Sequence, residues 1–310
     1  MMTEISASAV KELRERTGAG MMDCKKALTE NKGDMEAAVD WLRTKGLAAA
    51  AKKAGRTAAE GLVGAVTTGT VGAIIEINAE TDFVARNEKF QEYVKTAANL
   101  ALKANSDLDA FKNTSYPDTG RSIAEELTNL ISVIGENMEV RRFKNLQVEQ
   151  GVVTSYIHSA IAPGLGRIGV LVALESSGEK AKLETLGKQI AMHAAAANPQ
   201  ACNIADLDPS VIERERKIFA EQARESGKKE EFIEKMIEGR LRKFYEESVL
   251  VEQVYLIDDT KRKVSQVIAD AAKEIGVPVD LKGFALFKLG EGIEKEVADF
   301  AAEVAQQLGK

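Results

Sequence analysis

Residues 61–86 read GLVGAVTTGTVGAIIEINAETDFVAR, and this stretch decides the fold. Two apolar runs, 62–66 and 71–77, flank a Thr-Gly-Thr turn at residues 68–70. Short runs rich in Val and Ile on either side of a glycine turn are typical of a β-hairpin. The polar residues from Asn78 onward indicate that the second strand ends there and that the chain then enters a helix.

The segment after this hairpin has a helical period. Apolar residues recur three or four positions apart, which predicts two amphipathic helices, the second ended by Gly135. A strand at Met138–Phe143 would complete a β-β-α-α-β unit over residues 61–150. The predicted buried faces are Phe90, Val94, Ala97 and Ala101 in the first helix, and Ile123, Leu127, Leu130, Ile131 and Ile134 in the second.

The same order of elements recurs further along the chain. A hairpin at 152–158 and 168–174 leads into a helix at 180–197, and a strand at 283–289 closes the unit. The strand sequences GAIIEI, residues 72–77, and GVLVAL, residues 169–174, are also alike. We therefore predict an internal duplication. The first core subdomain would span 61–150, and a related second one would span 151–208 and 248–289.

A highly charged insert, residues 209–247, interrupts the second subdomain. Ser226-Gly227-Lys228-Lys229 is a suitable turn between two helical stretches, so the insert predicts an antiparallel helical hairpin with one narrow apolar seam, a coiled coil. Such a hairpin packs on its own body or meets a partner, and a homodimer through it is one possibility. The predicted seam comprises Val211, Ile212, Ile218, Phe219, Phe232, Ile233, Met236, Ile237, Leu241 and Phe244.

Both ends of the chain predict helical modules. Residues 1–47 contain three short helical stretches separated by glycines, with Asp34 as the N-cap of the third and Gly46 as its left-handed C-terminal residue. Residues 48–60 are small and basic and read as a linker with nothing to bury. Residues 290–310 predict an amphipathic C-terminal helix with an apolar stripe at Ile293, Val297, Phe300, Val304 and Leu308. The expected fold class is α+β.

Composition excludes several classes of function. The 310-residue chain carries a net charge of −6, which disfavours general binding to nucleic acid. Its two cysteines, Cys24 and Cys202, give neither a disulfide framework nor a metal site. We find no signal sequence and no apolar run long enough to span a membrane, so we expect a cytoplasmic protein without a membrane partner.

An inventory of catalytic motifs argues against an enzyme. The only histidines, His158 and His193, lie in none of the common catalytic or metal-binding motifs, and both favour a structural role. Neither Gly18-Ala19-Gly20 nor Gly290-Glu291-Gly292 follows a strand with a third glycine in the required place, and a P-loop is missing. We therefore expect no catalytic residue, cofactor or metal.

Asp82 and Phe83, at the strand-to-helix junction, form the most informative pair. Two such neighbours cannot both face a core. In one interpretation Asp82 caps the next helix and Phe83 packs into its own core. In the other, Phe83 is an aromatic anchor for a partner, worth about 2–3 kcal/mol when buried there, with an acid beside it.

Three motifs, in this order along the chain, resemble the bacterial translation elongation factor Ts family. They are TGAGMMDCKKAL at 17–28, TDFVARN at 81–87 and GEGIEK at 290–295, and IAMH at 190–193 is similar as well. The resemblance implies a ubiquitin-associated-like N-terminal module, two related core subdomains, an inserted coiled coil and a C-terminal helix. It also implies guanine-nucleotide exchange on elongation factor Tu. The turn at 159–167 is longer and more apolar than is typical of the family.

The resemblance also implies which residues contact Tu. The segment Thr81, Asp82, Phe83 and Val84 would lie beside the magnesium and nucleotide site, and the remaining contacts would be Arg14, Met21, Met22, His158, Asp299 and Phe300. Two other classes of function compete with this one. A plain adaptor would bind a helical or ubiquitin-like ligand through its first module, and an enzyme would use scattered carboxylates.

Overall fold

The hairpin predicted from the central stretch forms the first two strands of a six-stranded antiparallel sheet. The computed structural model describes residues 5–227 and 229–294. Strand β1 spans Glu60–Thr68 and β2 spans Val71–Ala79, with Thr68 paired to Val71 across the turn. Gly69 permits this tight turn because its φ of 64° is left-handed.

The sheet consists of two units with the same pairing. In the first, β2 lies between β1 and β3 (Met138–Gln147). In the second, β5 (Leu165–Glu175) lies between β4 (Gly151–Ala162) and β6 (Asp280–Lys288). The start of β5 also pairs with β1, which joins the units into one sheet. The predicted α+β fold class is confirmed.

The β4–β5 hairpin is longer than predicted. We expected its strands to end at His158 and resume at Ile168, but pairing continues to Ala162 and Leu165, with an irregularity between Ala160 and Ala162. Only Pro163 and Gly164 form the turn, and Gly164 has a φ of 75°. The apolar residues of the expected turn therefore continue the strands, which is why this segment lacks the polarity of a loop.

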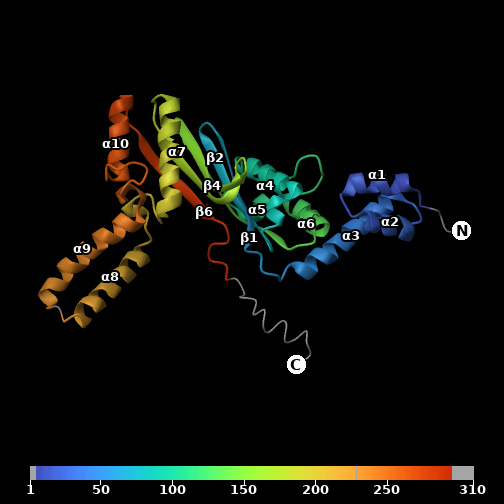
Figure 1. The fold of residues 1–310 in the computed structure, drawn as a ribbon, viewed down its shortest axis with the longest axis horizontal. Helices are drawn as coiled ribbons and strands as arrows, with labels where there is room; N and C mark the ends of the chain where they lie inside the picture. Colours follow the sequence, from blue (N-terminus) through green and yellow to red (C-terminus); the bar gives the residue numbers. More distant parts are fainter. Residues whose placement is uncertain (1–4, 228, 295–310) are drawn as a thin grey trace.

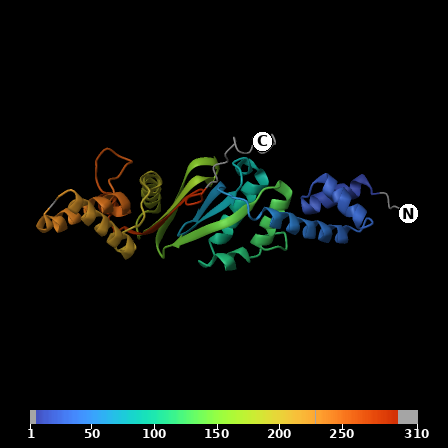
Figure 2. The same cartoon turned by 90° about the horizontal axis from the view of Figure 1, so that it is seen from below.

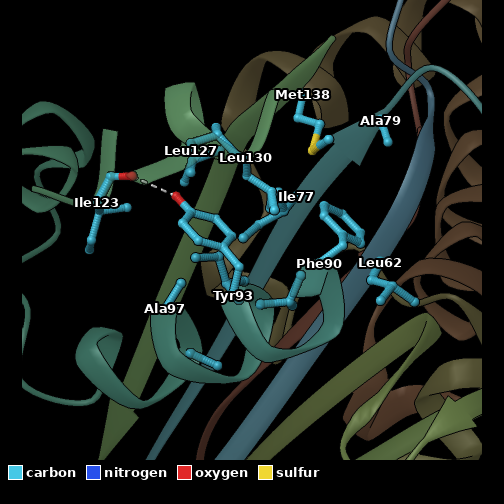
Figure 3. Close-up of a cluster of buried hydrophobic side chains, with 14 of the residues drawn as sticks. Leu62, Ile77, Ala79, Phe90, Tyr93, Ala97, Ile123, Leu127, Leu130 and Met138 are labelled. Carbon is cyan, nitrogen blue, oxygen red and sulfur yellow. Dashed lines mark hydrogen bonds between the residues drawn. The ribbon is translucent and has the colours of Figure 1, made fainter. Parts of the chain in front are cut away.

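Three helices cover the outer face of the first unit: α4 (Glu88–Ala101), α5 (Leu108–Lys112) and α6 (Ile123–Ile134). Figure 3 shows the core between them and the strands, where the Tyr93 hydroxyl donates to the carbonyl of Ile123 at 2.8 Å. Gly135 ends α6 with a φ of 92°, as predicted. The predicted faces of α4 and α6 are buried here except Ile134, which is half-buried.

The second unit has its own core under α7 (Lys180–Ala197) and α10 (Val264–Ile275). Gly187 lets α7 approach β4 closely, since an added Cβ would lie 2.6 Å from the Thr154 hydroxyl. A third cluster, on the opposite face of the sheet, packs the two units together: Val63, Ile74, Val148, Val153, Leu171, Ala173, Ala285 and Phe287.

The N-terminal module consists of α1 (Ala7–Thr17), α2 (Met21–Glu30) and α3 (Met35–Lys53). Asp34 caps α3, as predicted. The prediction that Gly46 ends this helix is wrong. Gly46 lies inside α3 at a contact with α6, where an added Cβ would meet the Ser132 side chain at 3.0 Å. The segment after it does bury surface, because Ala50 joins the core of the first unit.

The charged insert forms a helical hairpin of α8 (Pro209–Glu225) and α9 (Glu230–Ser248). Its seam buries Ala223, Ile233, Ile237 and Leu241. Two residues that we expected in the seam, Ile218 and Phe232, are exposed instead because they lie outside the line of contact between the helices. At its base, Ile212, Phe244 and Tyr245 pack on Ala201, Leu207 and Val249.

The molecule is elongated. Figures 1 and 2 both show α1–α3 at one end, the sheet with its helices in the middle and the α8–α9 hairpin at the other end. After β6 the chain turns at Gly290–Glu291. Most of the predicted C-terminal helix, from residue 295, lies outside the described residues.

Candidate partner-binding site

The segment after β2, residues 80–87 and here called the Phe83 loop, is fixed to the corner between α6 and β3. Thr81 donates to the Glu136 carboxylate through its backbone N–H at 3.0 Å and its hydroxyl at 2.8 Å. Conversely, the Glu80 carboxylate accepts the N–H of Asn137, whose side chain donates to the carbonyl of Arg56 at 2.8 Å. The loop therefore has two successive anchors.

This anchored loop presents Phe83 to solvent. The Phe83 side chain is 76% exposed and Asp82 is also exposed, whereas Val84 and Ala85 turn inward. A short 3-10 helix at Val84–Arg86 leads into α4. Leaving an aromatic ring in water forgoes about 1.5–3 kcal/mol of burial, so this exposure calls for a reason outside the chain's own core.

The alternative interpretation of this pair is wrong on both counts. Asn87, not Asp82, caps α4, because its Oδ1 accepts the N–H groups of Lys89 and Phe90 at 3.0 and 3.3 Å. The ring of Phe83 does not enter the core. Phe90, in the first turn of α4, is the aromatic residue that is fully buried in this core.

Sequence reasoning missed the residues that anchor the loop. Glu136 and Asn137 follow the helix-ending Gly135 and read as an ordinary polar corner. Thr81 and Glu136 are 55 positions apart, so no local pattern links them. One signal could have indicated such anchors: Glu80 and Thr81 are polar residues directly after an apolar strand, and polar groups at a buried strand end need hydrogen-bond partners.

The N-terminal module offers a second exposed apolar surface. Met21 and Met22 begin α2 and are 60% and 77% exposed. Arg14 is exposed on the neighbouring α1. Flexible thioether side chains are common at protein-binding surfaces, so this module is suited to contact with another chain.

The two histidines differ in environment. His158 is exposed on β4, where the Tyr156 hydroxyl lies 3.1 Å from its Nδ1. His193 is completely buried, and its Nδ1 accepts the N–H of Leu256 at 3.2 Å, which leaves Nε2 to donate to Gln253 at 3.0 Å. Burial lowers the pKa of His193, against the opposing hydrogen bond to Gln253.

The structure does not gather the predicted contacts into one pocket. Thr81–Val84 are contiguous, Arg14, Met21 and Met22 lie in the end module, and His158 lies on the β4–β5 hairpin. Asp299 and Phe300 lie outside the described residues. Residues spread along the long axis suit an extended protein surface better than a small molecule.

Cys24 and Cys202 are both buried free cysteines. Burial raises the pKa of Cys202 to about 11 and also raises that of Cys24, so both thiols stay protonated at neutral pH. Across residues 5–227 and 229–294, His, Cys, Asp and Glu side chains form no group of three that could hold a metal ion. No helix in the same ranges is long and apolar enough to cross a membrane.

A family of known proteins matches most of this chain. The family model described as elongation factor TS matches residues 80–291, from the Phe83 loop to the turn after β6. The chain belongs to the elongation factor Ts family. It is 62% identical to elongation factor Ts of Rhodospirillum centenum, over 99% of this chain and all of that protein. It is 61% identical to the Rhodospirillum rubrum protein over the full length of both.

Membership of the elongation factor Ts family extends over the whole chain, beyond the segment that the family model matches. The relative from Paramagnetospirillum magneticum, also named elongation factor Ts, is 61% identical over 99% of this chain and 98% of its own length. The N-terminal module and the hairpin insert are therefore shared with these relatives. The chain is a translation elongation factor.

Proposed function

We propose that this protein is the guanine-nucleotide exchange factor for elongation factor Tu, and that it acts in the cytoplasm without covalent chemistry. The observation that carries this proposal is the exposure of Phe83 on an anchored loop. A loop that hydrogen bonds hold in place presents its aromatic side chain to a partner with less conformational entropy to lose on binding than a free loop would. Family membership supports Tu as that partner.

Exchange rests on differential affinity. The factor binds empty Tu more tightly than nucleotide-loaded Tu, and by linkage the nucleotide weakens the factor to the same extent. Each tenfold change that one ligand makes in the affinity of Tu for the other corresponds to about 1.4 kcal/mol of coupling free energy. In our proposal Phe83 enters Tu beside its magnesium site and displaces the elements that support the metal. The negative charge of Asp82 then disfavours the phosphates nearby.

Distant contacts supply the affinity that offsets this distortion. Met21, Met22 and Arg14 at the end module and His158 on the β4–β5 hairpin are exposed and available. By family resemblance, Asp299 and Phe300 add a further contact. A single side chain is insufficient, because lowering the affinity of Tu for its nucleotide by several powers of ten takes more free energy than the burial of one ring supplies.

The test is the release of a fluorescent GDP analogue from Tu in excess GDP, with this protein present at catalytic amounts. We expect a large acceleration that saturates with the concentration of Tu·GDP. No acceleration by folded protein with competent Tu would contradict the proposal and would favour an adaptor without exchange activity.

A further inference from the structure

Gly46, inside α3, marks the place where the N-terminal module (α1–α3) is seated on the core. It is buried, and glycine in the interior of a helix costs stability relative to alanine. An added Cβ at this position would meet the Ser132 side chain of α6, with Oγ at 3.0 Å and Cβ at 3.2 Å. The absence of a side chain therefore has a packing reason, which is the close approach of α3 to α6.

α3 extends from the module toward the sheet and contacts α6 along much of its length (Figure 1). Near the start of α6, Arg43 donates to the Glu125 carboxylate at 2.9 Å. At the other end, the Lys53 ammonium would lie 4.0 Å from a Cβ added to Gly135, the residue that ends α6. Since the contact at Gly46 lies between these two, α3 lies beside α6 from its first turn to its last.

Away from this helix pair, the seam between the module and the core is loosely packed. A cavity of about 430 Å³ lies between α3 and the turn at residues 119–121, and one of about 290 Å³ lies between the end of α1 and α4. The walls of a cavity lack the contacts that packed side chains make across an interface. The contact between α3 and α6 therefore sets where the module lies on the core.

The chain that leaves α3 joins the anchor of the Phe83 loop. Arg56, shortly after this helix, accepts from the Asn137 side chain through its carbonyl at 2.8 Å, and its guanidinium pairs with Glu80 at 3.5 Å. Asn137 and Glu80 are themselves joined by the backbone bond that anchors the loop. The other anchor, Glu136, directly follows the end of α6. The module is thus connected to the Phe83 loop through α6 and through the end of α3.

We propose that Gly46 is a positioning residue that holds the N-terminal module and the Phe83 loop in one rigid arrangement, so that both contact the same partner at once. Two contacts on one rigid body bind more tightly than the same contacts on bodies that move independently, because the second forms without a further loss of orientational freedom. The inference rests on the proposed exchange function for the identity of the partner, while the packing of α3 on α6 is a property of this chain alone.

The test compares Gly46→Leu with Gly239→Leu in the full chain. The module has its own apolar core, so Gly46→Leu should separate it from α6 without unfolding it. Gly239 is the matched control because it also lies inside a helix, α9, and an added Cβ there would meet nothing within 4 Å. Hydrogen exchange of the 129–135 amides, measured by mass spectrometry, reports whether α3 still covers α6. The dissociation constant for nucleotide-free Tu is measured by titration calorimetry, each time with and without Met22→Ala.

We expect Gly46→Leu to accelerate amide exchange at 129–135 about fivefold or more and to raise the dissociation constant about tenfold. In that background Met22→Ala should weaken binding by less than about 1.5-fold, because the displaced module no longer contacts Tu together with the Phe83 loop. In the wild type and in Gly239→Leu, Met22→Ala should weaken binding about threefold. Unchanged amide exchange, an unchanged dissociation constant, or losses that multiply to about 30-fold in the double variant would each overturn the proposal.

Failure of this inference is distinguishable from failure of the proposed function. A wild-type chain that binds Tu without accelerating GDP release would contradict the exchange function alone, and the dissociation constants would still decide the role of Gly46. A wild-type chain that does not bind Tu would overturn both.

A smaller substitution covers the case in which Gly46→Leu fails to fold. Gly46→Ala adds only the Cβ that would meet Ser132 at 3.0 Å, and it displaces α3 less. We expect it to weaken binding about threefold, with less than about 1.5-fold further loss from Met22→Ala. A full threefold further loss from Met22→Ala in a folded Gly46→Ala protein would contradict the proposal.

Discussion

The two units of the sheet share strand pairing but differ in the connection that follows their central strand. After β2, the Phe83 loop extends outward, is held by Glu136 and exposes an aromatic ring. After β5, residues 176–179 close tightly. Ser176 donates to the carbonyl of Pro278 at 2.6 Å, and an added Cβ at Gly178 would come within 2.4 Å of Ile275.

The difference between the two connections distinguishes what the fold requires from what a partner-binding element requires. Both connections satisfy the same structural need, which is to lead a central strand into a covering helix. The second does so with small residues packed against its own unit. The first uses a longer segment whose anchors hold Phe83 away from the core, and this is the property expected of a partner-binding element.

The largest effect should come from Phe83→Ala. Loss of a ring that is buried only in the complex should lower kcat for GDP release about 30- to 150-fold, which corresponds to an increase of about 2–3 kcal/mol in activation free energy. Stability should change by less than about 0.5 kcal/mol because the ring is exposed. Phe232→Ala is the matched control, since Phe232 is 54% exposed on the hairpin. Equal losses from both variants would remove the distinction between the loop and the rest of the surface.

The anchors of the two connections give a paired prediction. Thr81→Val removes the hydroxyl bond to Glu136, and a hydrogen bond to a charged group contributes about 1.5–3 kcal/mol. We expect about a tenfold lower kcat as the loop loses its fixed geometry. Ser176→Ala removes the corresponding bond of the second connection and should lower stability by about 1 kcal/mol without affecting GDP release. The reverse pattern would show that the second connection carries the activity.

A pH effect should arise from His193 in the second unit. Burial lowers the pKa of His193 below 6.5. At pH values between the folded pKa of His193 and its unfolded pKa of 6.5, the unfolded chain binds a proton that the folded chain does not. The contribution of His193 to the free energy of unfolding is therefore fully present above pH 6.5 and is lost as pH falls through the folded pKa. The slope from this one group is at most about 1.4 kcal/mol per pH unit. Urea unfolding of wild type and His193→Gln checks it; an identical slope below pH 6.5 would exclude His193 as the source.

The smallest effect should come from Met22→Ala in the N-terminal module. A peripheral contact contributes affinity, and most such contacts cost less than about 1 kcal/mol when truncated. We expect KM to rise about threefold, with kcat unchanged. A fall in kcat comparable to that of Phe83→Ala would mean that the module takes part in displacing the nucleotide.

The sequence predicted the elements whose signals are local. The β1–β2 hairpin follows from two apolar runs on either side of the turn at Gly69, and α4 and α6 follow from their apolar period. The role of Gly46 was mistaken because a glycine that ends a helix and one that allows two helices to touch look alike without knowledge of Ser132. The exposure of Phe83 was undecidable for the same reason, as its loop is held by Glu136 from 55 positions away.

One measurement tests the central claim most directly: the dissociation constants of the factor for nucleotide-free Tu and for Tu·GDP, with wild type and with Phe83→Ala. If Phe83 acts by displacing the nucleotide, Phe83→Ala should lower the ratio of the dissociation constant for Tu·GDP to that for empty Tu by about the factor lost in kcat. The dissociation constant for empty Tu should change by less than about tenfold. If both constants weaken equally and their ratio is unchanged, Phe83 is only an affinity anchor and the account is contradicted.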